Sequence, residues 1–336
     1  MPNITSSTLR TIALALSVGL ASLLAGCTSG PGAPPETIAP ASPSTPVASV
    51  AAPVTFTDDL GNQVVVKTAN RVVACMGSFA NMWELAGGTL VGVSDDVFDQ
   101  YSLTSQNVSL IGDFTAPNLE QIIALEPDFV IMTGASGGRG GSGAAQFDLK
   151  PSLDSAGIPV AYFTVTTFEG YLRTMKTMTT ITGREDMYQQ YGEQIDVQID
   201  ALLATVPKRE IKPTVALMTT YSGGTVVQSS STMTGAMLSD LGADNIADQN
   251  PSLLRDFSLE SLIDINPDFI LIVPMGNDAA AATQALEEET AANPAWDTLD
   301  AVENGHYLTL DPRLFQYKPN ADWAESYQTL FDILYA

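Results

Sequence analysis

The chain has 336 residues, with 38 Asp and Glu against 14 Lys and Arg, so its formal net charge is −24. A negative field of this size repels phosphate backbones and anionic lipid headgroups, which argues against nucleic-acid binding and against membrane association through basic patches. The single histidine, His306, argues against a metal site built from several histidines.

An apolar segment near the start of the chain predicts export from the cytoplasm. Residues 11–25 are almost wholly apolar and too short to span a membrane comfortably. They run through Leu-Ala-Gly into Cys27, a layout that resembles the processing box of bacterial lipoproteins, so residues 1–26 are predicted to be a signal peptide and Cys27 to carry a lipid. Residues 27–52 are rich in Pro, Ser and Ala and predict a disordered tether. The folded part is thus expected outside the cytoplasm, held at the cell membrane by the lipid anchor alone.

The remaining chain, about 285 residues, is long enough for two lobes, because a single core rarely grows beyond that size. Residues 53–166 predict the first lobe, in which a hairpin is followed by short apolar runs that alternate with helical stretches. This alternation predicts a parallel sheet in an α/β lobe, with Cys75 and Trp83 as buried packing residues. The expected strands are 71–75, 90–93, 110–112, 128–133 and 157–164, and the expected helices are 79–88 and 119–125.

Residues 167–207 predict a helical region. An apolar stripe from Phe168 to Ile181 predicts one helix, and apolar residues at spacings of three and four predict another from about Glu185 to Val206. At 1.5 Å per residue the second helix would be about 33 Å long, enough to bridge two lobes. Residues 208–336 predict a second α/β lobe, with strands at 214–221, 268–274 and 306–310 and helices at 233–243, 259–265, 279–292 and 321–335.

Two segments, one in each predicted lobe, correspond to each other. Residues 118–130 read NLEQIIALEPDFV, and residues 258–270 read SLESLIDINPDFI. Both place Leu-Glu at the start of a short amphipathic helix and then pass through Pro-Asp-Phe into a strand. This internal correspondence predicts two similar lobes.

These segments, together with LVGVSDD, NPAWDTLDAVENGHYLTLD and LFQYKPNADWAESY, resemble the solute-binding proteins of bacterial ABC importers for iron siderophores, haem and vitamin B12. The resemblance covers about residues 55–335. It implies an α/β fold of two Rossmann-like lobes joined by a single long helix, of the class III periplasmic binding protein type. It also implies a monomer that captures a ferric siderophore or related metal chelate between its lobes and delivers it to the transmembrane subunits of an ABC permease. A haem or cobalamin receptor of the same importer type is the alternative.

The same resemblance assigns one exposed glutamate on each lobe to docking against arginines of the permease. The matching positions are Glu120 and Glu260, which each follow Leu at the start of a predicted helix. A carboxylate suits this role because bidentate pairing with arginine fixes both position and angle. The alternative is that each glutamate only stabilises the first turn of its helix through the helix dipole.

The expected ligand contacts follow predicted strands, because ligands of open α/β lobes lie beyond the carboxyl ends of the strands. These residues are aromatic or methionine-bearing and carry little charge, which suits a bulky amphipathic ligand. An anionic ligand could also meet Arg139, Arg313 or Lys318, for which exposed surface charge is the alternative. The predicted contacts are Met76, Ser78, Phe79, Thr133, Phe163, Tyr221, Met275, Arg313 and Tyr317.

Catalysis is not expected. The loop 134–143 contains G-x-G-x-x-G, but the strand after it lacks an acidic residue for a ribose, so the loop is predicted to be a flexible lip of the cleft. No nucleophile elbow is present and no acid, base and nucleophile can be grouped, so neither a catalytic residue nor a resident metal or cofactor is predicted. A secreted α/β enzyme is the alternative of another class, and a receptor for bare metal ions is disfavoured by the single histidine.

Overall fold

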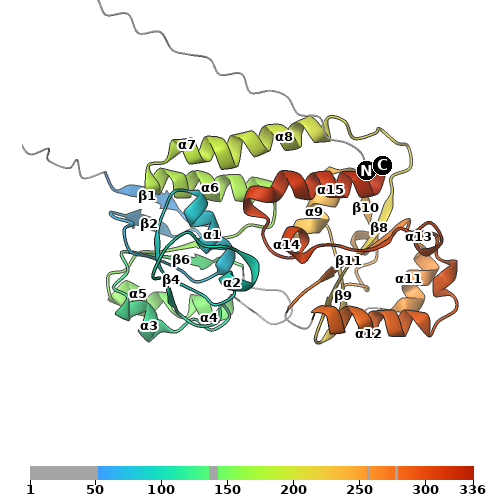
Figure 1. Ribbon diagram of the computed structural model, residues 1–336, viewed down its shortest axis with the longest axis horizontal. Coiled ribbons are helices and arrows are strands. Elements are labelled where there is room, and N and C mark those ends of the chain that lie inside the picture. The colour runs from blue at the N-terminus through green and yellow to red at the C-terminus, as the bar shows by residue number, and fades with distance from the viewer. Residues whose placement is uncertain (1–51, 136–142, 256–257, 277–278) are drawn as a thin grey trace, which may run out of the picture. The chain divides into compact units, whose positions relative to one another are not determined.

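The computed structural model describes residues 52–135, 143–255, 258–276 and 279–336 (Figure 1). The predicted signal peptide, Cys27, nearly all of the predicted tether and Arg139 lie outside these residues. Within the described ranges, no helix combines the length and the hydropathy needed to cross a membrane.

The first lobe is built on a parallel sheet with the strand order β5-β4-β3-β6-β7. Every residue of β3, β6 and β7 is buried, as expected for a sheet covered on both faces. The antiparallel hairpin β1–β2 precedes the sheet, and the buried carboxylate of Asp58 holds its turn by accepting from the N–H groups of Leu60 (3.0 Å) and Asn62 (2.8 Å). The strands are β1 (Val54–Thr57), β2 (Gln63–Val66), β3 (Val72–Ala74), β4 (Leu90–Val93), β5 (Ser109–Leu110), β6 (Phe129–Thr133) and β7 (Val160–Phe163).

The helices of the first lobe are short, and the first of them begins two residues before the predicted start. The N–H of Gly77 donates to the carboxylate of Asp96 (3.0 Å), and a Cβ at Gly77 would lie 2.7 Å from the Cα of Val97. Only glycine therefore fits this close approach. The helices are α1 (Gly77–Leu85), α2 (Val97–Gln100), α3 (Leu119–Ala124), α4 (Ala144–Phe147) and α5 (Lys150–Ser155).

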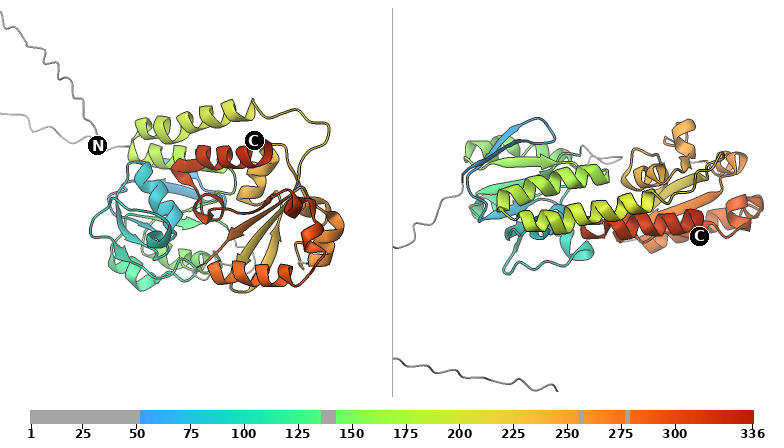
Figure 2. Two further views of the ribbon diagram at one scale, coloured as in Figure 1. Left: turned by 45° about the vertical axis from the view of Figure 1, so that its right-hand side comes forward. Right: turned by 90° about the horizontal axis from the view of Figure 1, so that it is seen from above.

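The helical region contains both predicted helices. The first begins where the Thr167 side chain accepts from the N–H of Gly170 (3.1 Å) and ends at Gly183, whose φ of 71° suits glycine. The second runs without a break from Glu185 through a π-helical turn and ends at Leu203, slightly before the predicted end. Its first part packs against α6 and its last part against α15, the final helix of the chain (Figures 1 and 2). The elements are α6 (Phe168–Thr182), α7 (Glu185–Tyr188), η1 (Gln189–Glu193), α8 (Gln194–Leu203) and α15 (Trp323–Tyr335).

The second lobe has a parallel sheet of order β10-β8-β11-β12, as the alternating sequence pattern predicted. Two strands were not predicted: β10, which pairs in parallel with the start of β8, and β9, which forms an antiparallel hairpin with the second half of β8. The strands are β8 (Thr214–Tyr221), β9 (Gly224–Gln228), β10 (Asp244–Asn245), β11 (Phe269–Pro274) and β12 (Tyr307–Thr309). The helices are α9 (Met233–Asp240), α10 (Ile246–Gln249), α11 (Leu259–Ile265), α12 (Ala279–Ala291), η2 (Trp296–Thr298), α13 (Asp300–Glu303), α14 (Pro312–Phe315) and η3 (Asn320–Asp322).

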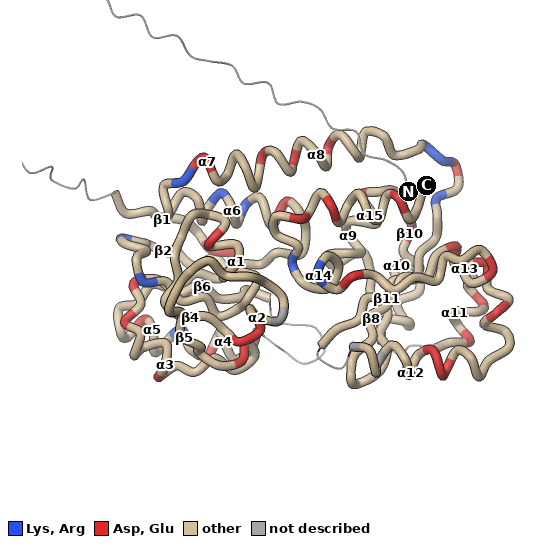
Figure 3. The backbone as a smooth tube through the Cα atoms, in the orientation of Figure 1, with Lys and Arg blue, Asp and Glu red and all other residues tan. Residues whose placement is uncertain are grey.

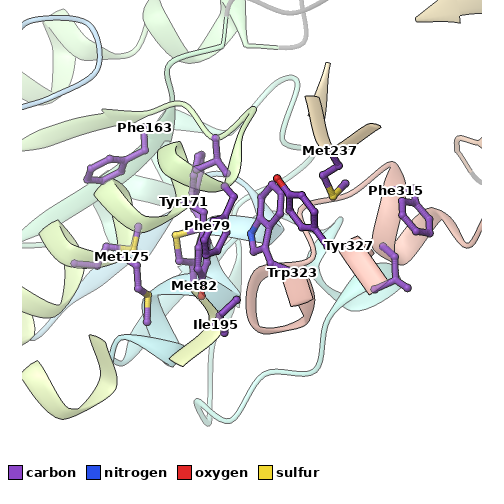
Figure 4. Packing of buried hydrophobic residues seen from close by; sticks show 14 of the residues in the cluster. Phe79, Met82, Phe163, Tyr171, Met175, Ile195, Met237, Phe315, Trp323 and Tyr327 are labelled. Carbon is purple, nitrogen blue, oxygen red and sulfur yellow. The ribbon is translucent and has the colours of Figure 1, made fainter. Parts of the chain in front are cut away.

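One continuous apolar core joins the two lobes on the side covered by α6, α8 and α15. It contains residues of both sheets, such as Val72 and Leu217, and it is linked through the buried aromatic residues of the helices. The ring of Trp323 in α15 lies 6.0 Å from that of Tyr171 in α6 (Figure 4). Two smaller cores cover the opposite faces of the two sheets, and Cys75 and Trp83 are both fully buried, as predicted. The lobes are therefore packed together along the helices and do not depend on the connecting helix alone.

Candidate functional site

Each sheet has one point where the strand order reverses, and the carboxyl ends of the strands at that point form the expected binding edge of an α/β lobe. In the first sheet the reversal lies between β3 and β6, and in the second it lies between β8 and β11. Met76 and Thr133 stand at the first reversal, and Tyr221 and Met275 stand at the second. The sequence predicted all four of these positions as ligand contacts.

A single short segment, residues 316–318, contacts a methionine at both of these edges. The side-chain amide of Gln316 donates to the Met275 sulfur (3.1 Å), and the ammonium group of Lys318 donates to the Met76 sulfur (3.7 Å). Tyr317 lies between them in the chain and is partly buried. Residues 316–318 therefore lie next to the strand-end edges of both lobes.

Further hydrogen bonds hold this segment against the first lobe. The hydroxyl of Tyr101 donates to the carbonyl of Lys318 (2.8 Å). The side-chain amide of Asn320 donates to the carbonyl of Ser78 (2.9 Å) and to the side-chain oxygen of Asn81 (2.8 Å). The position of Lys318 is therefore fixed relative to α1 and to the end of β3.

Lys318 is partly buried and its charge is weakly compensated. Besides Met76, its ammonium group faces the ring of Phe79, 5.2 Å from the ring centre. Burial lowers the pKa of Lys318 to about 8, although the nearby carboxylate of Asp96 opposes this shift. Asp96 is itself committed to the N–H of Gly77 and to the hydroxyl of Ser94 (2.5 Å). None of the ion pairs in the described part of the chain involves Lys318.

Arg313, the other predicted cation, differs from Lys318 because acidic side chains surround it. Its guanidinium group pairs with Asp322, with Glu325 at 3.2 Å and with Asp311 at 3.8 Å. Figure 3 marks acidic residues in red and basic residues in blue along the backbone near α14 and α15. These carboxylates already neutralise the charge of Arg313. In this arrangement Arg313 holds α14 to the start of α15. Its compensated charge would attract an anionic ligand only weakly.

The second lobe has a small cavity of about 120 Å³ beside its strand ends. No charged side chain lines this cavity. The amide of Gln228 donates to the hydroxyl of Thr219 (3.3 Å), and the hydroxyl of Thr234 donates to the carbonyl of Phe315 (2.6 Å). The cavity thus offers neutral donors and acceptors next to Gln316. Its lining residues are Leu217, Thr219, Gln228, Thr232, Met233, Thr234, Val273, Phe315 and Gln316.

Tyr221 and Ser222 lie at the edge of a separate groove of about 400 Å³ between the β8–β9 hairpin and α12. A wider hollow of about 550 Å³ lies in the first lobe, but its residues, among them Lys67 and Asp154, come from segments before the strands and not from their carboxyl ends. We therefore place the candidate site at the strand reversals, where the polar contacts converge.

Four of the predicted contacts are buried in the first lobe. Phe79 and Phe163 are 0 % and 3 % exposed and pack against each other in the shared core, with ring centres 6.2 Å apart. Ser78 and Thr133 are 3 % and 4 % exposed, and the N–H of Thr133 donates to the buried amide of Gln146 (3.0 Å). In this conformation these four side chains are too deeply buried to touch a ligand directly.

Sequence reasoning missed the residues that position Lys318. Asp96, Tyr101 and Asn320 were not predicted as site residues. Asp96 lies near the Lys318 ammonium group, Tyr101 donates to the Lys318 carbonyl, and Asn320 anchors the segment to α1. Tyr101 and Lys318 are 217 positions apart in the chain, so no spacing pattern connects them. Among the described residues, no group of three or more His, Cys, Asp or Glu side chains could hold a metal ion.

Glu120 and Glu260 occupy equivalent places in the two lobes. Each is exposed in the first turn of its helix, α3 or α11. The caps are equivalent as well, because Asn118 accepts from the N–H of Gln121 (3.1 Å) and Ser258 accepts from that of Ser261 (3.2 Å). Each cap side chain satisfies one N–H of the first turn, and the carboxylates of Glu120 and Glu260 both face solvent.

Comparison with known proteins agrees with this architecture. The chain is 25 % identical over 281 residues to the iron(3+)-hydroxamate-binding protein FhuD of Bacillus subtilis, covering 78 % of this chain and 80 % of that protein. It is 26 % identical over 259 residues to the Fe(3+)-citrate-binding protein YfmC of the same organism, covering 76 % and 77 %. Among solved structures, Staphylococcus aureus IsdE complexed with heme superimposes with a TM-score of 0.64 at 17 % identity, covering 79 % of this chain and 99 % of that one.

The α/β fold with parallel sheets and helices is therefore the one predicted from the sequence. The model of the family described as periplasmic binding protein matches residues 72–314, which include both sheets and the helices between them. The chain belongs to the periplasmic binding protein family.

Proposed function

We propose that the protein is the extracytoplasmic solute-binding subunit of an ABC importer and that its solute is a ferric siderophore or a related metal chelate. The observation that carries this proposal is the segment 316–318, which contacts both Met76 and Met275. A solute beside this segment would touch the binding edges of both lobes at once. The hydroxamate, citrate and haem named for the relatives support a chelate as the solute class.

The proposed contacts combine soft, apolar and neutral polar groups. Met76, Met275, Tyr221 and Tyr317 supply polarisable surface, and the cavity beside Gln316 supplies hydroxyl and amide groups. Such a lining suits a bulky organic shell around a metal ion better than it suits the bare ion. The protein is proposed to hold this solute without changing it chemically, which agrees with relatives that are named as binding proteins.

Delivery is proposed to use Glu120 and Glu260, which would pair with arginines of the permease. Their equivalent, exposed positions in two lobes support this role, because a docking surface needs a contact on each lobe to fix its orientation. We further propose that Cys27 carries a lipid that keeps the protein at the outer face of the cell membrane. The Leu-Ala-Gly-Cys layout after an apolar segment supports the anchor.

Titration of the purified full chain tests the proposal, with quenching of tryptophan fluorescence as the signal. The ligands are ferric citrate, the neutral iron(III) trihydroxamate ferrichrome, haemin, cobalamin and free ferric chloride. Saturable binding of one chelate, with a dissociation constant in the micromolar range or below, is expected. Binding of haemin or cobalamin alone would select the haem or corrinoid receptor, and absence of binding throughout would reject the proposed function.

A further inference from the structure

Lys318 is unusual among the cations described in this chain because it is partly buried at the proposed solute site and has no acidic partner within ion-pair distance. Its ammonium group faces the thioether of Met76 and the ring of Phe79, and its backbone carbonyl accepts from the hydroxyl of Tyr101. A thioether and a ring face compensate a positive charge only weakly. The ammonium group of Lys318 is therefore desolvated, and its positive charge is only partly compensated.

Arg313, which lies nearby in the chain, differs from Lys318 in having carboxylates within ion-pair distance. Both residues lie between β12 and α15, but Arg313 is neutralised by three carboxylates. Lys318 has only Asp96 nearby, and that carboxylate is already hydrogen-bonded to Gly77 and Ser94. In a chain with 38 acidic residues, an ammonium group without a close carboxylate is poorly explained by structural needs alone.

We infer that Lys318 is the charge-recognition residue of the solute site and that the solute is a carboxylate-bearing, anionic chelate. The inference rests on the proposed function and deepens it by naming the solute class. The fixed position of Lys318 beside Met76 places the charge at the reversal of the first sheet, where a ligand is expected. A carboxylate opposite the ammonium group would form a charge-assisted hydrogen bond in a partly desolvated place, where such bonds are strongest.

Affinity measurements on variants of the full chain at pH 7 test this inference. Lys318→Met should weaken the binding of ferric citrate or haemin, the two carboxylate-bearing probes, by roughly 10- to 100-fold. Lys318→Gln should act in the same direction, while any affinity for neutral ferrichrome should change by less than about threefold. Lys212→Met is the matched control, because Lys212 is exposed and already paired with Asp244 (3.2 Å), and it should leave all affinities unchanged.

The outcomes separate this inference from the proposed function. Equal binding of the anionic probes by the wild type and Lys318→Met would overturn the inference, and so would a wild type that binds only ferrichrome, although the proposed function would then stand. Failure of the wild type to bind any chelate would reject both. Preference for ferric citrate over haemin would identify a ferric polycarboxylate, and the reverse would identify haem propionates, with either result supporting the anionic class.

Two further readouts test the inference, one without any ligand and one with whichever anionic probe binds. Replacing a desolvated cation with an apolar side chain of similar size is neutral or stabilising, so Lys318→Met should fold and should have an equal or higher Tm at pH 7.

The pKa of about 8 for Lys318 also implies that its positive charge is lost as the pH rises. The ratio of wild-type to Lys318→Met affinity should therefore fall roughly tenfold from pH 7 to pH 9. This ratio separates the lysine from Asp96, Tyr101 and Tyr317, the other titratable groups near it. A ratio that stays constant would contradict the inference.

Discussion

The helix–strand unit α3–β6 of the first lobe and the unit α11–β11 of the second are built alike at both ends and differently in the turn between helix and strand. At the start of each, a capped helix exposes a glutamate and buries one apolar residue, Ile122 or Leu262. At the end of each, an aspartate carboxylate accepts from the backbone beside the neighbouring strand: Asp128 from Arg71 (2.9 Å) and Asp268 from Thr214 (2.7 Å).

The difference lies where each helix ends. Both units place a residue with positive φ before the proline, but it is Glu126 (46°) in the first and Asn266 (50°) in the second. Asparagine tolerates this conformation, and its side chain also bonds to Asp300, whereas the end of α3 is held by the guanidinium of Arg71. Different contacts thus stabilise the two helix ends, whereas an exposed glutamate is present in both units.

The largest expected effect is on stability, at the buried position of each unit. Ile122→Ala and Leu262→Ala should each lower the free energy of unfolding by about 2–5 kcal/mol, because both side chains are fully buried in their cores. Chemical denaturation measures the change. Ile123→Ala, next to Ile122 but 39 % exposed, is the control and should cost less than about 1 kcal/mol. Equal costs for the buried and exposed positions would contradict the packing described for α3.

The next effect concerns docking. Glu120→Arg combined with Glu260→Arg should reduce uptake of the labelled chelate by cells about 30-fold or more, since like charges would meet at the permease. The affinity of the purified protein for the chelate should not change. The control is Glu169→Arg with Glu303→Arg, two exposed glutamates at positions without this correspondence, which changes the net charge by the same amount. Equal uptake by both double variants would show that the paired glutamates serve only their helices.

A smaller effect is expected at the caps. Asn118→Ala and Ser258→Ala should each cost about 1 kcal/mol, because each removes the acceptor for an N–H in the first turn. Asn118→Asp and Ser258→Asp keep the acceptor and should cost almost nothing. Thermal unfolding compares the four variants, and aspartate variants as unstable as the alanine variants would refute the capping role.

The last two effects should have opposite signs in the two units, and the smallest of all is expected at Glu126. Glu126→Gly should stabilise the protein by about 0.5 kcal/mol, because glycine adopts positive φ without steric cost. Asn266→Ala should destabilise it by about 1–2 kcal/mol, because alanine loses both the conformational tolerance and the bonds to Asp300. Changes in the free energy of unfolding that have the same sign at both positions would show that the two helix ends are not stabilised differently.

Much of the fold could be predicted because its elements carry local signals. The helix at 259–265 and the strand at 214–221 match their predicted bounds, since amphipathic spacing and β-branched runs mark them clearly. β9 was missed although Gly223 and Gly224 between two β-branched runs are a hairpin signal. Helices of four residues, such as α10, are too short to show a period, and this one depends on its cap at Asn245.

The candidate site was harder to predict than the fold. Position after a strand was enough to place Met76 and Met275 at the strand-end edges, because topology brings strand ends to one edge. It could not separate them from Phe79 and Phe163, whose burial depends on residues from distant segments. The different states of Arg313 and Lys318 depend on carboxylates contributed by other elements, which no spacing in the sequence reveals.

Hydrogen exchange with and without the bound chelate tests most directly whether the solute lies between the two strand-end edges. Exchange of backbone amides is measured by mass spectrometry on the full chain. We expect protection at 74–79 and 132–135 in the first lobe, at 219–222 and 273–276 in the second, and at 315–320. Protection confined to one lobe, or to the groove between the β8–β9 hairpin and α12, would contradict a shared site.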